Sequence, residues 1–138
     1  MSLNIVQEVV KLGTAYISGQ TDKSVTLKKG ELSLGVYDKE NLVGFKLTGD
    51  LDGASVCIVH DTDNYSRSNP KYEYMYDDAR KDALHVATQF LEDKITVKKK
   101  EEKKFFRVKQ VQKVCIPNQK GQINEYEPLT VNTTNFFE

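Results

Sequence analysis

Residues 77–93 carry the clearest periodic pattern in the chain. The apolar residues of this segment recur at spacings of three and four, which places them on one face of a helix. They are Ala79, Ala83, Val86, Ala87 and Phe90. Asp77 and Asp78 stand where carboxylates offset the positive end of a helix dipole. The narrow apolar face favours close packing on a sheet, with Arg80 and His85 outside that face.

Alternating apolar residues upstream of this helix predict β-strands. The alternating stretches are 25–27, 32–36 and 43–47. Residues that favour turns, chiefly Gly, Asp and Asn, separate them. Residues 54–59 are nearly all apolar, which is typical of a central strand covered on both faces.

These patterns predict an α+β fold. We expect a mostly antiparallel sheet of about five to six strands, with one central helix packed on a face. Residues 2–12 predict a short N-terminal helix that ends at Gly13. Residues 1–116 are expected to form a single α+β domain. Apolar residues are spaced irregularly in residues 117–138. We expect this segment to form an extended C-terminal arm docked on the domain or on a neighbouring subunit.

The composition is typical of a soluble globular protein. The 138 residues are 38% hydrophobic, which is sufficient for one core. No stretch approaches the roughly 18 apolar residues that span a membrane, and we see no export signal. Cys57 and Cys115 lie in apolar runs, which favours buried, reduced thiols. We therefore expect a cytoplasmic or virion-associated protein without a membrane partner.

The charges are divided unevenly along a chain whose formal net charge is zero. Residues 94–113 hold nine basic and two acidic side chains, and we call this segment the basic ribbon. Residues 38–93 hold twelve acidic and six basic side chains. The neutral total therefore describes a dipolar molecule with an acidic middle.

Three interpretations of the basic ribbon remain open. Two strands with a lysine-rich turn at 98–104 could follow a phosphate backbone, with Phe105 available for stacking. The ribbon could instead contact an acidic protein partner or the acidic middle of another copy, since complementary patches permit head-to-tail contacts. It could also be a solvated hairpin that resists aggregation. The candidate partner-binding or nucleic-acid-binding residues are Lys98, Lys99, Lys100, Lys103, Lys104, Arg107 and Lys109.

A polar stretch at 60–70 follows the most apolar strand, a common place for sites on rigid scaffolds. We expect it to be a loop. Its candidate ligand residues are His60, Asp61, Asp63, Tyr65 and Arg67. One imidazole and two carboxylates suit a metal, and His60 begins the His-x-Thr form used by two-histidine phosphodiesterases. The other histidine, His85, lies in the predicted helix at the wrong spacing, so solvated loop residues are favoured.

No established catalytic motif occurs in the sequence. It lacks a Gly-rich phosphate loop, a Gly-x-Ser-x-Gly elbow, a Cys-x-x-Cys pair and a His-Glu-x-x-His helix. This absence disfavours an enzyme, and we expect no cofactor and no metal. The favoured function is a non-enzymatic interaction or assembly protein, acting as a homo-oligomer or as a subunit of a larger complex such as a virion or phage-type accessory structure. The alternatives are nucleic-acid binding by the basic ribbon and a small-ligand or metal-dependent phosphodiester site around His60.

Overall fold

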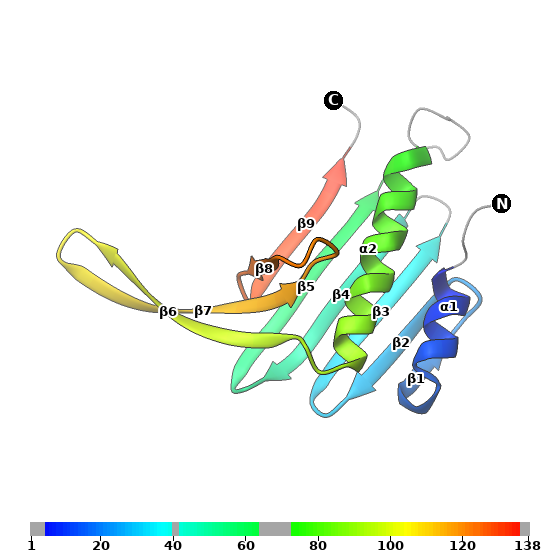
Figure 1. Cartoon of the computed structure of the whole chain (residues 1–138), viewed down its shortest axis with the longest axis horizontal. Coiled ribbons are helices and arrows are strands. Elements are labelled where there is room, and N and C mark those ends of the chain that lie inside the picture. The colour runs from blue at the N-terminus through cyan, green and yellow to red at the C-terminus, as the bar shows by residue number, and fades with distance from the viewer. Residues whose placement is uncertain (1–4, 40–41, 64–72, 136–138) are drawn as a thin grey trace.

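The computed structural model describes residues 5–39, 42–63 and 73–135. Within them, the larger of two sheets has six strands in the order β1-β2-β3-β4-β5-β9 (Figure 1). Neighbouring strands are antiparallel, except that β9 runs parallel to β5. The strands are β1 (Ile17–Gln20), β2 (Ser24–Lys29), β3 (Leu32–Lys39), β4 (Leu42–Leu51), β5 (Ala54–Asp63) and β9 (Leu129–Asn135).

Two helices cover one face of this sheet and bury the core against it (Figure 1). They are α1 (Ile5–Leu12), which a 3-10 turn η1 (Thr14–Tyr16) links to β1, and α2 (Glu73–Leu91). The strands bury alternate residues, because successive side chains of a strand point to opposite faces. The expected α+β class with mostly antiparallel pairing is confirmed.

A second, three-stranded sheet has the order β6-β7-β8, so the described residues form two sheets and not the single expected one. Its strands are β6 (Thr96–Lys104), β7 (Arg107–Pro117) and β8 (Ile123–Tyr126). Val114 and Ile116 of β7 join the main core. The expected C-terminal arm therefore contains two strands within the described residues, β8 and β9, one in each sheet.

Helix α2 differs from the expected segment at its start. It begins at Glu73, so Asp77 and Asp78 lie within the helix and do not cap it. Most of the predicted apolar face is buried, but Arg80, which lies outside that face in the sequence pattern, is only 1% exposed. After the helix ends, Asp93 adopts a φ of 59° and the Lys94 amide donates to the Gln89 carbonyl at 2.9 Å. This left-handed residue closes the helix in the position where glycine is common.

Within the described residues, strand β5 buries one face fully and the other only in part. Val56 and Ile58 lie in the core, whereas Cys57 and Val59 on the opposite face are half-buried. The interpretation of 54–59 as a strand covered on both faces is therefore wrong. Cys57 and Cys115 are both free thiols, and Cys115 is buried.

Candidate functional site

Strands β6 and β7 form a long hairpin that projects away from the rest of the molecule (Figure 1). Their register runs from Thr96 opposite Cys115 to Lys104 opposite Arg107. Eight residue steps along β6 at about 3.3 Å each carry the tip about 26 Å from Thr96. Residues 107–110 of β7 are all exposed, so the outer half of the hairpin packs against nothing within the described residues.

The turn of this hairpin consists of two phenylalanines, Phe105 and Phe106, and we call them the aromatic tip. Both side chains are fully exposed. Phe105 has a φ of +58°, a conformation that two-residue hairpin turns usually assign to Gly, Asn or Asp. A side chain in this region costs about 1–2 kcal/mol. Internal packing therefore favours neither ring, and turn geometry disfavours Phe105.

The seven basic residues predicted for binding all lie on this hairpin. Lys98, Lys99, Lys100, Lys103 and Lys104 belong to β6, and Arg107 and Lys109 belong to β7. The prediction that 98–104 forms a polar turn is wrong, because these residues form a strand and the aromatic tip makes the turn. Sequence reasoning missed this turn because Phe-Phe carries none of the usual turn residues.

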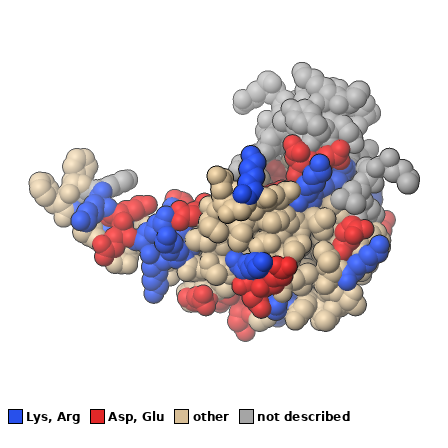
Figure 2. All heavy atoms as spheres, in the orientation of Figure 1, with Lys and Arg blue, Asp and Glu red and all other residues tan. Residues whose placement is uncertain are grey.

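Acidic residues outside the hairpin pair with two of its lysines, and Glu102 lies opposite Lys109 within the hairpin. Lys100 pairs with Glu125 of β8 at 2.6 Å, and Lys113 lies 3.8 Å from Glu127. The pKa of Glu125 is lowered, chiefly by its hydrogen bond from Lys100. Among the described residues, Lys103 and Arg107 beside the aromatic tip form no salt bridge. Figure 2 shows tan atoms, which carry no charge, at the far end of the hairpin, followed by blue and red atoms toward the rest of the molecule.

The candidate ligand residues at 60–70 do not form one site within the described part of the chain. The expectation of a loop beginning at His60 is wrong, since β5 continues to Asp63. His60 lies on the helix side of the sheet. Its ring stacks on that of Phe45 with the ring centroids 5.8 Å apart, and its Nδ1 lies 3.9 Å from Oδ2 of Asp82 of α2. Strand alternation places Asp61 on the opposite face. Tyr65 and Arg67 lie outside the described residues.

Asp61 has a structural partner on its own face of the sheet. The Tyr37 hydroxyl donates to Asp61 Oδ2 at 2.5 Å. Gly44 lies between these residues in the register, and a side chain there would come within 2.5 Å of the Asp61 Cβ. Burial, and next the hydrogen bond to Asp61, raise the pKa of Tyr37 above its usual value of 10.0.

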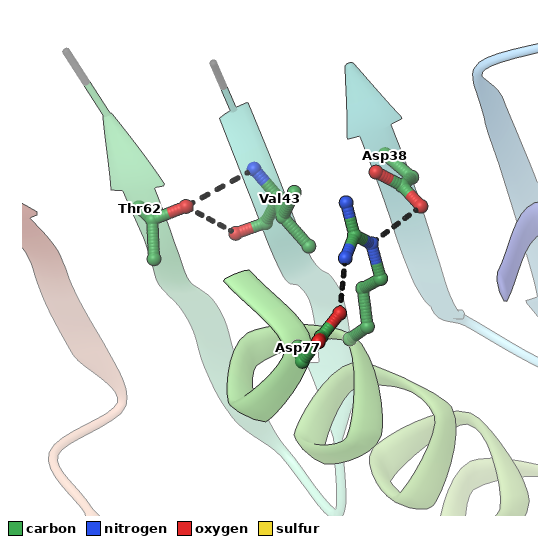
Figure 3. Close-up of polar contacts among 5 residues, drawn as sticks. Asp38, Val43, Thr62 and Asp77 are labelled. Carbon is green, nitrogen blue, oxygen red and sulfur yellow. Dashed lines mark hydrogen bonds and ion pairs between the residues drawn. The ribbon is translucent and has the colours of Figure 1, made fainter. Parts of the chain in front are cut away.

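A second polar cluster joins α2 to the same end of the sheet (Figure 3). Arg80 Nε donates to Asp38 Oδ2 at 3.0 Å, and Arg80 Nη1 donates to Asp77 Oδ1 at 2.5 Å. Thr62 Oγ1 contacts the backbone N and O of Val43, each at 3.3 Å. Sequence reasoning missed this cluster, because Asp38 lies 42 residues from Arg80.

His85 lies at the junction of the two sheets. Its Nε2 donates to the Pro117 carbonyl of β7 at 2.7 Å, so His85 makes a structural contact within the chain. Burial raises the pKa of Asp82, while His60 and His85 oppose this shift. The residues of α2 that face β5 and β7 thus hold the layers together.

Comparison of the chain with known protein families, with curated proteins and with solved structures gives no match. Among the described residues, no three His, Cys, Asp or Glu side chains are grouped so as to hold a metal ion. In the same residues, neither helix combines the length and apolar content needed to cross a membrane.

The feature that local packing explains least is the aromatic tip with its basic flanks, because both rings are fully exposed.

Proposed function

We propose that this chain is a non-enzymatic interaction protein that acts as a homo-oligomer or as a subunit of a larger assembly. The β6–β7 hairpin is its contact element. The observation that carries the proposal is the full exposure of Phe105 and Phe106 at the end of a projecting hairpin. Exposed apolar groups beside charged residues are typical of protein interaction sites. An intracellular setting, including a virion or accessory structure, fits the two free thiols.

The energetics of the aromatic tip limit what kind of partner it requires. Burial of one phenylalanine contributes about 1.5–3 kcal/mol, so both rings together contribute roughly 3–6 kcal/mol. A complex with micromolar affinity needs about 8 kcal/mol. The partner must therefore accept the rings and also contact the charged flanks, which favours an acidic surface with an apolar recess.

A hairpin whose only role is to remain solvated would not be expected to carry apolar residues at its tip. Lysines along an edge strand discourage pairing with other chains. Two fully exposed phenylalanines at the tip have the opposite effect, since they present apolar surface to any neighbour. The combination favours a charged hairpin that binds through its end.

The test is the mass of the protein in solution, measured by light scattering at micromolar concentration and at low and high salt. We expect the native chain to be oligomeric at low salt and the double variant Phe105→Ser, Phe106→Ser to be monomeric. Leu12→Ser is the matched control, because Leu12 is a 56% exposed apolar residue on α1, away from the hairpin. A native chain that is monomeric at both salt concentrations would contradict the homo-oligomer proposal.

Nucleic-acid binding is the second candidate, and the arrangement of the basic residues favours it. The register places Lys98, Lys100, Arg107 and Lys109 on one side of the hairpin, near an aromatic tip able to stack on bases. Binding of a labelled single-stranded oligonucleotide would then weaken steeply with salt. No shift of that oligonucleotide at low ionic strength removes this candidate.

A further inference from the structure

A cavity of about 430 Å³ lies at the opposite end of β6 from the aromatic tip. Three separate connections form it: the β2–β3 turn, the β4–β5 turn and the link from α2 to β6. Its volume lies within the range of about 300–1,000 Å³ that is usual for ligand pockets. We call it the acidic pocket.

The acidic pocket has apolar walls and a rim of carboxylates. The apolar lining consists of Leu32, Phe90 and Ile95, each less than 10% exposed, and of the half-buried Leu51. The rim carries the exposed residues Glu31, Asp50, Asp52 and Asp93.

One ammonium group, that of Lys29, also lines the acidic pocket. It is already engaged, because it donates to the Leu91 carbonyl at 2.8 Å and pairs with Asp93 at 3.0 Å. The pocket therefore offers apolar surface inside an excess of negative charge.

The aromatic tip has the complementary chemistry. Two exposed rings match the apolar walls, and Lys103 and Arg107 on either side match the acidic rim. We infer that the aromatic tip of one copy of this chain docks in the acidic pocket of a second copy. This inference rests on the proposed function and names its partner.

The contact has to join two molecules, because the aromatic tip of one chain cannot reach the acidic pocket of the same chain. Thr96 lines the acidic pocket, and β6 runs from Thr96 directly away from it. The aromatic tip consequently lies about 26 Å from its own pocket along a hydrogen-bonded hairpin. Such a contact is heterologous, so successive copies close into a ring or continue as a filament.

Two variants with complementary defects test this contact. The tip variant carries Phe105→Ser and Phe106→Ser, and the pocket variant carries Glu31→Lys and Asp50→Lys. We expect each alone to associate roughly 30-fold more weakly than the native chain, the loss typical of a central interface residue. An equal mixture should form a 1:1 dimer that grows no further, because it contains one intact tip for each intact pocket.

The control for the pocket variant is Glu8→Lys with Asp22→Lys, which changes the charge equally. Glu8 lies on α1 and Asp22 lies between β1 and β2, and neither lines the acidic pocket. This control should assemble like the native chain.

Adding Lys103→Glu and Arg107→Glu to the pocket variant should restore assembly, because the tip flanks and the pocket rim then again carry opposite charges. Circular dichroism spectra identical to that of the native chain establish that each variant is folded.

The outcomes separate the inference from the proposed function. If the tip variant is monomeric while the pocket variant assembles normally, the hairpin is the contact element and the acidic pocket is not its partner. If the mixture contains only monomers, the inference is overturned in the same way. A native chain that is monomeric throughout overturns both.

Discussion

Arg80 is the residue whose environment most departs from its chemical type. It is 1% exposed, although a buried guanidinium is tolerated only with close ionic partners. Asp38 and Asp77 supply those partners from different parts of the chain. Among the described residues, Arg80 Nη2 and Asp61 Oδ1 are the buried side-chain atoms without a hydrogen-bond partner. The polar end of the sheet is thus held by a small number of specific contacts.

We expect the two carboxylates that bind Arg80 to differ in their effect on stability. Asp38 is 9% exposed, so Asp38→Asn leaves a buried charge poorly compensated and should cost about 3–5 kcal/mol. Asp77 is 45% exposed, and Asp77→Asn should cost about 1 kcal/mol or less because water screens the pair. Urea unfolding measures both. Equal losses would show that Arg80 does not depend on its buried partner.

Tyr37 should make stability depend on pH in the alkaline range. Because the pKa of Tyr37 is raised in the folded state, its phenol stays protonated while that of the unfolded chain ionises above pH 10.0. The contribution of Tyr37 is therefore fully present below pH 10.0 and is lost as the pH rises further. Tyr37→Phe should cost about 1–3 kcal/mol at neutral pH, since Asp61 loses its donor.

The measurement for Tyr37 is the difference in unfolding free energy between the native chain and Tyr37→Phe at several pH values. The other tyrosines are common to both proteins, so their effects cancel. We expect the difference to be constant from neutral pH to about 9 and to narrow above 10. A difference that stays constant through pH 11 would contradict a raised pKa for Tyr37.

At the scale of elements, the β6–β7 hairpin combines a favourable register with an unfavourable turn. Nine residue pairs hold β6 to β7, yet the turn between them places Phe105 in a left-handed conformation. Strain of this kind is kept where function requires the side chain. Local stability and partner binding should therefore respond in opposite directions to a change at Phe105.

We expect Phe105→Asn to stabilise the tip of the hairpin by roughly 1 kcal/mol, because asparagine tolerates a positive φ. Backbone amides of Lys104 and Arg107, the pair whose hydrogen bonds close a two-residue turn, should then exchange more slowly with solvent, while self-association weakens. Phe106→Asn is the matched control, since Phe106 has no positive φ. It should weaken self-association without slowing exchange. Faster exchange in Phe105→Asn would argue that the turn is not strained.

At the scale of the whole molecule, the basic and acidic segments of the sequence are also separated in space. The aromatic tip with its basic neighbours lies at one end of β6, and the acidic pocket lies at the other. A formal net charge of zero therefore permits attraction between copies with little overall repulsion.

Self-association should weaken with salt but persist in part. The screening length falls from about 10 Å at 0.1 M salt to about 3 Å at 1 M, which reduces the attraction between exposed charges. Burial of the two rings does not depend on that attraction. Sedimentation equilibrium at several salt concentrations should give a dissociation constant that rises several-fold across this range. Association that strengthens steadily with salt would indicate a contact without a charged component.

Local pattern was sufficient to predict part of this structure. The spacing of apolar residues identified most of α2, and strict alternation identified β2, β3 and β4, because both periods follow directly from backbone geometry. The concentration of lysines in residues 94–113 was also visible, although their arrangement was not. The expected binding residues could be named from the sequence, whereas the turn that presents them could not.

The sequence by itself thus determined the α+β class, the main helix and the separation of acidic from basic segments. Only the tertiary structure decided that Arg80 is buried, that β9 pairs in parallel with β5, and that three distant connections enclose the acidic pocket. These features depend on residues tens of positions apart, whose contacts leave no local period. The same reason applies to the aromatic tip, where pairing of β6 with β7 forces two phenylalanines into a turn that their own preferences oppose.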